Sequence, residues 1–411
     1  MTAAEDQLPL SSLSEPPTQE DVVDQVRDAY AAETPIYPIG GGTSLAYGLP
    51  GRSPGIGLRL TGLNRIVDYP ARDMTITVEA GITLTALGEE LGRQGQRLPI
   101  DAGEPDRATL GGLIAANFSG PRRYGYGTLR DYVIGIGAVD GRGTPFKAGG
   151  RVVKNVAGYD LCKLLTGSLG SLAVITQVTL KVRPVPEATA FVRCSIRNWQ
   201  EGEALLTGLI ASRTTPAAVE LLRGPHWSDE PFAARGETVA QLWVGFEGSR
   251  TEVNWQIDEL RREWHAQPGD TIDDFRNGTA EPIWHRLAEF GAAGPPLVIK
   301  AGVLPSSVTT FMETLIGIDG DVSIQAHAGN GIVVAALPDF SLADAAKVLV
   351  QTLQPAAVAA GGNVVVWSCA AGELTRQAAW GAALGGADLM RSVKQQFDPK
   401  SLLNPGRCAY G

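Results

Sequence analysis

The sequence has few cysteines, and their spacing excludes whole classes of redox centre. No two of the four form a Cys-x-x-Cys pair, so zinc ribbons and iron–sulfur clusters held by this chain alone are excluded. No His-x-x-His or Glu-x-x-His spacing indicates another metal site. Any electron carrier in the chain is therefore expected to be organic. The cysteines are Cys162, Cys194, Cys369 and Cys408.

Positive charge and long apolar runs are also scarce. The formal net charge is −9, which argues against nucleic acid or an anionic membrane surface as the main partner. No apolar run reaches about 18 residues, so the sequence predicts no transmembrane segment. Residues 1–20 lack the basic patch and apolar stretch of a secretory signal. We expect a cytoplasmic protein, or one held at the inner membrane through partner subunits.

The chain is long and rich in glycine. A chain of 411 residues exceeds one compact core and predicts two or three folding units. Its 50 glycines indicate a backbone that often turns tightly or approaches another group. A long apolar strand at 172–182 is followed by Pro184 and Pro186, which cannot donate to a sheet ladder. We therefore expect domains at 1–186 and 187–411.

Both parts are expected to mix helices and strands in an α+β fold. In the first part, Thr18 and Asp21 form a capping-box pattern before apolar residues at helical spacing, whereas 74–79 alternates as a strand. In the second part, strand candidates such as 241–246 alternate with helices such as 252–264. This order predicts a sheet that carries helices on one face.

The strongest local signal is the run Pro-Ile-Gly-Gly-Gly-Thr-Ser-Leu at 38–45. Consecutive glycines let successive N–H groups point into one concavity and accept a pyrophosphate at close range. No Gly-Lys-Ser/Thr follows, which excludes a Walker loop, and 46–54 cannot open a helix, which excludes a dinucleotide fingerprint. From these residues alone, an anion-binding nest and a plain strand-to-loop turn are equal alternatives.

Two further features lie later in the first part. A second glycine-rich cluster at 101–120 repeats the same theme and again indicates close approach of the backbone to another group. The pair Arg122 and Arg123 is either an ordinary solvated pair or one that faces a phosphate. The sequence does not choose between these two interpretations.

The first half resembles the FAD-binding domain of the vanillyl-alcohol oxidase and p-cresol methylhydroxylase type, which is built in two parts. Within that family, Lys-Asn-Val-Ala-Gly-Tyr-Asp-Leu at 154–161 and Leu-Asn-Pro-Gly-Arg at 403–407 resemble the glycolate oxidase and D-lactate dehydrogenase branch. By length and by a weakened second half, the chain resembles the FAD-binding E subunits of bacterial glycolate oxidases. The segments that match in the family's order are 40–45, 109–112, 124–135 and 170–176.

The resemblance implies noncovalent binding of FAD by the first part, and a substrate or cap-type second part whose C-terminal segment returns toward the flavin. Some relatives attach FAD through a histidine in the first loop, where Thr43 and Ser44 stand here. Asparagine and threonine would supply donors, and the glycines would leave room for the cofactor. The residues expected to bind FAD are Gly40, Gly41, Gly42, Thr43, Ser44, Leu45, Thr109, Leu110, Gly112, Asn117, Gly120, Val174 and Ile175.

The second half departs from the catalytic members of that branch. Their motif has the form His-x-Gly-Asp-Gly-Asn-x-His, whereas this chain has His-Ala-Gly-Asn-Gly at 327–331 followed by three apolar residues. Around 361–367 it also lacks the Glu-His pair of a second motif. Two roles for His327 therefore stay open. It is either a base, with Asn404 or Arg407 near the substrate, or a purely structural histidine.

The resemblance implies a subunit of a glycolate oxidase complex, which oxidises glycolate to glyoxylate and passes electrons through flavin to a partner. Its partners would be a larger FAD-binding catalytic subunit and an iron–sulfur subunit, and its substrate a small 2-hydroxy acid. Neither nucleic acid nor a metal is expected. Two alternatives stay open: a self-sufficient FAD-dependent D-lactate or glycolate dehydrogenase, and a noncatalytic flavin-binding assembly subunit.

Overall fold

The computed structural model describes residues 8–150, 158–233, 236–264, 272–291, 296–370, 374–382 and 385–409. The chain divides into two compact units, each of which mixes helices and strands, so the expected α+β fold is confirmed. The first unit combines Met1–Ser119, Thr128–Val185 and Ala383–Gly411, and the second combines Gly120–Gly127 and Pro186–Ala382.

One short segment departs from the expected ranges 1–186 and 187–411. Helix α4 (Arg123–Tyr126) belongs to the second unit, although the residues on both sides of it belong to the first. The backbone N–H of Gly125 donates to the carbonyl of Ala217 at 3.1 Å. A side chain at Gly125 would come within 2.9 Å of the backbone before Ala217, so glycine permits this close approach.

The C-terminal segment, Ala383–Gly411, belongs to the first unit rather than to the range 187–411, and the sequence predicts its return toward the flavin. The N–H of Ile36 donates to the carbonyl of Leu402 at 2.8 Å, which adds the tail to the edge of strand β2. The ammonium of Lys394 donates to the carbonyl of Ser171 at 2.7 Å and to that of Leu403 at 3.0 Å. The contact between Lys394 and Ser171 joins parts of the chain 223 residues apart.

The first unit contains a parallel three-stranded sheet in the order β1-β3-β2 and an antiparallel five-stranded sheet in the order β4-β5-β9-β7-β8. Helix α1 begins at the expected capping box of Thr18 and Asp21, and it packs through Val22 and Val26. The elements are β1 (Leu10–Ser14), α1 (Gln19–Ala32), β2 (Ile36–Ile39), β3 (Gly55–Arg59), β4 (Ile66–Asp68), β5 (Thr75–Glu79), α2 (Leu84–Gly92), β6 (Gln96–Arg97), α3 (Leu110–Ala116), α5 (Leu129–Tyr132), β7 (Val133–Asp140), β8 (Pro145–Gly149), α6 (Leu161–Leu165), β9 (Ala173–Lys181), β10 (Arg183–Pro184) and α14 (Ala387–Phe397).

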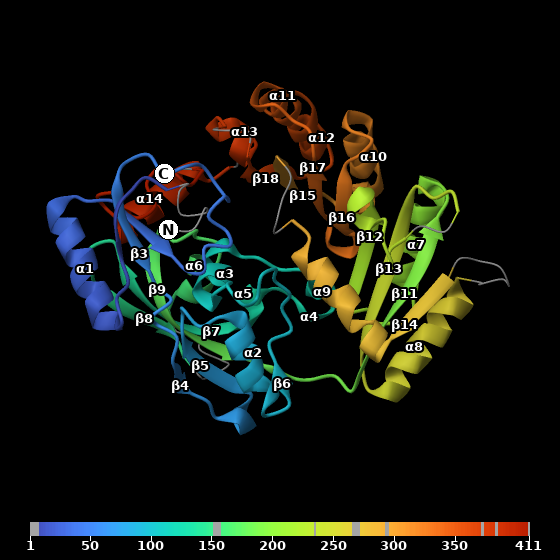
Figure 1. Cartoon of the computed structure of the whole chain (residues 1–411), viewed down its shortest axis with the longest axis horizontal. Coiled ribbons are helices and arrows are strands. Elements are labelled where there is room, and N and C mark those ends of the chain that lie inside the picture. The colour runs from blue at the N-terminus through green and yellow to red at the C-terminus, as the bar shows by residue number, and fades with distance from the viewer. Residues whose placement is uncertain are drawn as a thin grey trace. The chain divides into compact units, whose positions relative to one another are not determined.

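The second unit is built on one antiparallel sheet in the order β14-β11-β13-β12-β16-β17-β15-β18. Helices α7, α8, α10, α11 and α12 cover one face of it (Figure 1). The elements are β11 (Ala188–Ile196), α7 (Trp199–Ala211), β12 (Ala218–Arg223), β13 (Ala240–Gly248), α8 (Arg250–Glu263), β14 (Ile272–Arg276), α9 (Glu281–Glu289), β15 (Leu297–Gly302), η5 (Pro305–Ser307), α10 (Val308–Ile318), β16 (Ser323–His327), η6 (Ala328–Asn330), β17 (Ile332–Leu337), α11 (Leu342–Val348), η7 (Leu349–Leu353), α12 (Gln354–Ala359), β18 (Asn363–Cys369) and α13 (Arg376–Trp380).

The opposite face of this sheet is partly aromatic and partly polar. Its aromatic part contains Phe191 and Trp284, whose ring centroids lie 4.4 Å apart, and Trp243. Side chains alternate between faces along a strand, and Val219 and Leu221 belong to the helix-covered core. Glu220 between them therefore lies on the face opposite the helices, and the same argument places other polar residues there.

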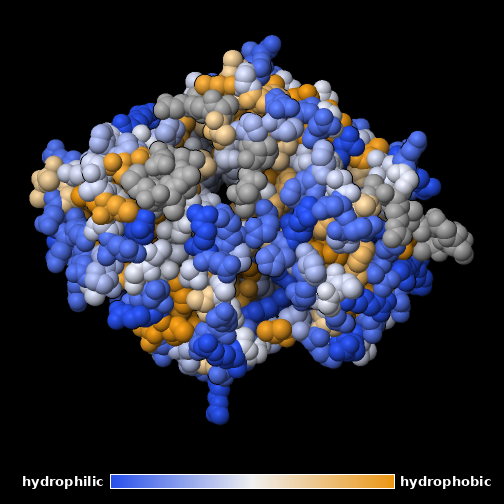
Figure 2. Space-filling view, viewed as in Figure 1, coloured by the Kyte–Doolittle hydropathy of each residue, from blue (hydrophilic) through white to orange (hydrophobic). Residues whose placement is uncertain are grey.

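The surface is mainly hydrophilic in the view of Figure 2, where the apolar side chains form separate patches. The apolar side chains with the largest exposed fractions include Ile210 of α7 and Leu389 of α14. Among the described residues, no helix is both long and apolar enough to span a bilayer.

Candidate functional site: a cofactor cradle and a polar sheet face

The glycine loop lies directly against the second glycine-rich cluster. A Cβ at Gly41 would overlap the backbone carbonyl of Arg107, and one at Gly40 would overlap the hydroxyl of Thr109. Gly42 has φ of +78°, which favours glycine. Only residues without side chains permit this approach, so the two clusters, distant in sequence, form one structural feature.

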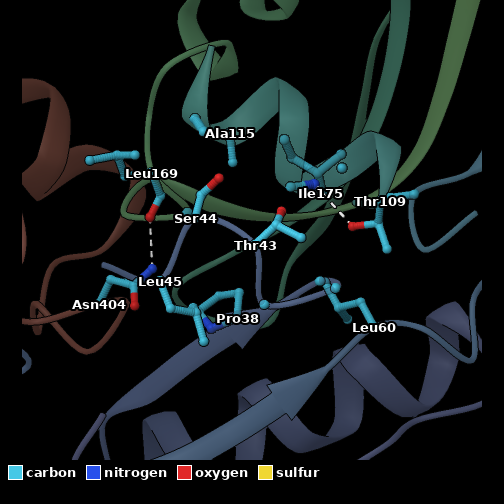
Figure 3. A pocket seen from close by; sticks show the side chains of 18 of the residues that line it. Pro38, Thr43, Ser44, Leu45, Leu60, Thr109, Ala115, Leu169, Ile175 and Asn404 are labelled. Atoms are coloured by element: carbon cyan, nitrogen blue, oxygen red, sulfur yellow. Dashed lines mark hydrogen bonds between the residues drawn. The ribbon is translucent and has the colours of Figure 1, made fainter. Parts of the chain in front are cut away.

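A pocket opens between these two clusters and the C-terminal tail (Figure 3). Nine of the thirteen residues expected to bind the cofactor line it, namely Gly40, Gly41, Gly42, Thr43, Ser44, Leu45, Thr109, Gly112 and Ile175. Residues that the sequence did not single out as cofactor ligands also line it. These are Pro38, Tyr47, Leu60, Ala80, Gly111, Ala115, Ala116, Leu169, Gly170, Ala173, Asn404 and Arg407.

Four expected cofactor residues lie outside this lining. Leu110 and Val174 are fully buried in the core, and Gly120 belongs to the second unit. Asn117 ends helix α3 with φ of +51°. Residues 154–157, the first half of the run at 154–161, lie outside the described residues.

The pocket fits an anionic cofactor with many acceptors. No carboxylate lines it, and its single charged side chain is the guanidinium of Arg407. Next to the lining, Oδ1 of Asn117 and Oγ of Ser168 are buried and have no hydrogen-bond partner among the described residues. Buried polar atoms without partners are uncommon in folded proteins, so a bound group with polar atoms of its own suits this pocket.

Arg407 holds the glycine loop through two hydrogen bonds. Its Nη2 donates to the carbonyls of Leu45 at 2.7 Å and Tyr47 at 2.9 Å. Burial lowers the pKa of Arg407, but an arginine stays charged across the physiological range. Asn404, which is predicted to lie beside the substrate, donates to the carbonyl of Leu169 at 2.7 Å, and this bond is drawn in Figure 3.

Replacing Arg407 with methionine is expected to weaken FAD binding about 10- to 100-fold, because two loop carbonyls lose a charged donor. The measurement is titration of the FAD-free protein with FAD. Arg391→Met is the control, since Arg391 is exposed on α14 and does not line the pocket. Equal affinities of the Arg407→Met variant and the unchanged protein would contradict the assignment.

A buried carboxylate–histidine pair lies on the polar face of the second unit's sheet. Nδ1 of His327 lies 2.8 Å from both carboxylate oxygens of Glu220, and Nε2 of Gln325 donates to Glu220 at 2.9 Å. The side chains of Glu220 and His327 are almost entirely buried. Because an ionised carboxylate accepts but cannot donate, Nδ1 carries the proton and Nε2 is left as the basic nitrogen.

Lys300 supplies positive charge on the same face. It lies between Ile299 and Ala301, which both belong to the helix-covered core, so its own side chain points to the polar face. Its ammonium lies 5.3 Å from the ring centroid of Trp367. Burial, and then the neighbouring charge of Arg123, lower its pKa to about 8.

The register of the sheet relates these two sites. Gln325 is opposite Val334 of β17, and Val334 is opposite Lys300 of β15. Strands in a sheet are spaced by about 4.8 Å, so the backbones at Gln325 and Lys300 are roughly 10 Å apart. A small molecule that spans the intervening strand would reach both the histidine pair and the lysine.

Arg122 anchors helix α4, and with it Arg123, in the second unit. Its Nε and Nη2 donate to Oε1 of Glu247 at 3.0 and 2.9 Å, and its guanidinium lies 3.9 Å from the ring centroid of Trp284. Arg122 is therefore neither a solvated side chain nor one that faces a phosphate. No signal in the sequence indicated Glu220, Lys300 or Glu247.

No group of three or more His, Cys, Asp or Glu side chains arranged for a metal ion occurs among the described residues. The redox group of this chain is instead identified by comparison with known proteins. The family model "FAD binding domain" matches residues 11–149, and "FAD linked oxidases, C-terminal domain" matches residues 378–408. The chain is an FAD-linked oxidoreductase, and FAD is its cofactor, as the sequence predicted.

Relatives of known name match over most of the chain. Glycolate oxidase subunit GlcD of Bacillus subtilis is 27% identical over 91% of this chain and 83% of its own length. D-lactate dehydrogenase of Anaerostipes hadrus is 26% identical over 97% and 89%. Glycolate oxidase subunit GlcE of Escherichia coli is 35% identical, but over only 43% of this chain and 50% of its own length. The expected resemblance to E subunits is therefore not supported over the whole chain.

Solved structures show the same fold. A structure of alkyldihydroxyacetonephosphate synthase aligns with a TM-score of 0.70 and 18% identity, covering 96% of this chain and 77% of its own. This likeness establishes the fold of p-cresol methylhydroxylase type FAD oxidases. It carries no information about the substrate.

Proposed function

We propose that this protein oxidises a small 2-hydroxy acid at its CH–OH group and that its own side chains act on the substrate. The observation that carries the proposal is the buried pair of Glu220 and His327 on the same sheet face as Lys300. A base and a cation, here the half-buried Lys300, are the two groups that such an oxidation requires from the protein.

His327 would accept the proton of the substrate hydroxyl. Glu220 holds Nδ1 and so directs the lone pair of Nε2 toward the proton. The negative charge of Glu220 also stabilises the imidazolium that forms. Gln325 fixes the carboxylate by donating to it, which keeps the ring of His327 in one orientation.

Lys300 and Arg123 would bind the substrate carboxylate. Two cations held near each other repel, and burial increases the cost. A substrate carboxylate between them would reduce both the repulsion of the two cations and the energetic cost of their burial. Perturbed cations of this kind are more frequent at functional sites than elsewhere, and Trp367 would exclude water from one side of the lysine.

The first unit would hold FAD through the glycine loop, Thr109 and the tail. Bound flavin supplies the acceptor for the hydride that leaves the substrate carbon. Binding is proposed to be noncovalent, because Thr43 and Ser44 stand in the loop and neither forms the bond that a histidine forms. Release of all flavin on acid precipitation is the expected result, whereas flavin that stays with the pellet would contradict it.

A second candidate is a subunit role within a glycolate oxidase complex. The names of two relatives, GlcD and GlcE, support an assembly of subunits. The missing second histidine at 334 would then be supplied in function by a partner. In this arrangement the partners would be a larger FAD-binding subunit and an iron–sulfur subunit, which holds the protein at the inner membrane from the cytoplasmic side.

The flavin spectrum distinguishes these candidates. The protein is expressed alone, loaded with FAD and mixed without oxygen with glycolate, D-lactate or L-lactate. The expected result is bleaching of the flavin absorption by at least one of these acids in the isolated chain. Bleaching only after partner subunits are added would overturn catalysis by the chain itself and favour the subunit role. Bound flavin that no acid reduces in either preparation would favour the assembly subunit.

A further inference from the structure

A cavity of about 310 Å³ in the second unit contains none of the residues assigned to FAD or to the hydroxy acid. It lies between helix α7, the segment of η5 and α10, and the turn η6. Its residues are Tyr124, Glu203, Leu206, Thr207, Leu209, Ile210, Val219, Pro305, Ser306, Thr309, Ala328 and Gly329.

The lining has an apolar interior and a polar rim. Leu209, Val219 and Ala328 are buried members of the helix-covered core, whereas Glu203 and Thr207 are exposed on α7. A volume of this size lies at the lower end of the range for small-molecule pockets, and an apolar cavity of about 150 Å³ already accepts benzene. A six-membered ring with a short substituent therefore fits.

Charge distinguishes this cavity from the polar sheet face. Its single charged side chain is Glu203, which accepts a hydrogen bond from Oγ1 of Thr309 at 2.8 Å. No lysine, arginine or histidine is among the residues that line it. A hydroxy acid, as an anion, would meet a negative charge and no cation here, so the cavity does not serve as a second substrate site.

The rim leaves a large apolar side chain in water. Ile210 is 82% exposed at the mouth, and Leu304, the neighbour of lining residue Pro305, is 54% exposed. A single exposed apolar residue is ordinary. An exposed residue that borders an open apolar cavity of ligand size adds to the surface that a bound molecule would cover.

One side of the cavity is closed by a tight contact. A Cβ at Gly329 would overlap the ring of Tyr124, so the ring packs closely against the backbone of η6. Tyr124 belongs to α4, which Arg122 anchors through Glu247. The cavity is therefore preformed, and binding would require little ordering of the chain.

We propose that this cavity is a second binding site, for a small organic amine whose ring lies among the apolar side chains and whose ammonium meets Glu203. The ring accounts for the volume and the apolar lining, and the ammonium accounts for the lone carboxylate at the mouth. The two sites share no residue.

The test uses three probes of one shape and different charge, added to the full chain with FAD bound. These are benzylamine, which is a cation at neutral pH, neutral benzyl alcohol and anionic benzoate. Binding is followed by the methyl resonances of Leu206, Leu209 and Val219. Benzylamine is expected to bind about fivefold more tightly than benzyl alcohol, the increment of one partly exposed ion pair. Benzoate is expected to bind more weakly than either.

Variants distinguish the contribution of the Glu203 charge from that of the cavity volume. Glu203→Gln keeps an acceptor for Thr309 and is expected to reduce the preference for benzylamine to about one, whereas Glu313→Gln, an exposed change on α10 outside the lining, should preserve it. Thr207→Phe or Ser306→Phe places a ring in the mouth from an exposed position and should abolish binding of both probes. Equal binding of benzoate and benzylamine, absence of shifts at the three methyl residues, or shifts that persist in both mouth variants would overturn the proposal.

Discussion

Replacing His327 with alanine is expected to lower kcat roughly 10²- to 10⁴-fold while FAD stays bound, the range that a positioned general base contributes. The reason is that Nε2 of His327 is the basic nitrogen of a pair whose other nitrogen is held by Glu220 at 2.8 Å. The measurement is the rate of flavin reduction by the hydroxy acid in rapid mixing, together with the flavin content of the purified variant.

Two further variants give this result its meaning. Glu220→Gln keeps the shape of the side chain but removes its charge, so it should lower kcat about 10- to 100-fold, because the imidazolium loses its stabilising partner. His285→Ala is the matched control, since His285 is an exposed histidine of α9 in the same unit. An unchanged rate of flavin reduction in the His327 variant would eliminate this histidine as the base and leave it a structural role.

Replacing Lys300 with methionine is expected to lower kcat/KM about 100-fold, mainly through a higher KM, because a half-buried cation that binds the substrate carboxylate is lost. The same change is expected to raise the free energy of unfolding by about 1–3 kcal/mol, since a desolvated charge next to Arg123 is removed. Steady-state kinetics and denaturant unfolding measure the two effects. Lys347→Met, an exposed change on α11, should alter neither.

The pH dependence of this site has a definite sign. The pKa of Lys300 is lowered to about 8 from 10.5, so its positive charge is lost as the pH rises through about 8. The value of kcat/KM should fall with rising pH above that point, and the Lys300→Met variant should lack this decrease. Because the unfolded chain keeps its proton up to 10.5, stability should rise with pH between about 8 and 10.5. A kcat/KM that is constant from pH 7 to 9.5 would contradict the assignment of Lys300.

The opposite effects on activity and stability separate a binding role for Lys300 from a packing role. If Lys300 only filled space, replacing it would lower the stability of the protein and leave KM unchanged. A site residue held at a cost to the fold gains stability when it is neutralised and loses function. The paired measurement on one variant is therefore more informative than either alone.

Local chemistry explains why much of the first unit could be predicted. Thr18 and Asp21 sit three residues apart and form the capping box that begins α1. The long strand predicted at 172–182 is β9 (Ala173–Lys181), and Pro184 lies in the separate short strand β10, which pairs with β6. The three consecutive glycines form the loop that lines the pocket, because their effect depends on backbone freedom and not on distant residues.

Long-range packing explains what the sequence did not predict. Glu220 is 107 residues from His327, and only the pairing of β12 with β16 brings them together. In the sequence, Lys300 is a single polar residue in an apolar strand. Only the register of the strands in the sheet relates it to Gln325. Arg407 was expected near the substrate, but it is the loop carbonyls of Leu45 and Tyr47 that it contacts.

The sequence by itself therefore determined the α+β class from local patterns, and its resemblance to a known family predicted the cofactor, FAD, whereas the glycine-rich loops alone left two alternatives open. Only the tertiary structure decided the composition of the polar site and the assignment of α4 to the second unit. The physical reason is that a charge pair or a close backbone approach is defined by distance in space. Sheet pairing and glycine contacts set that distance between residues far apart in the chain.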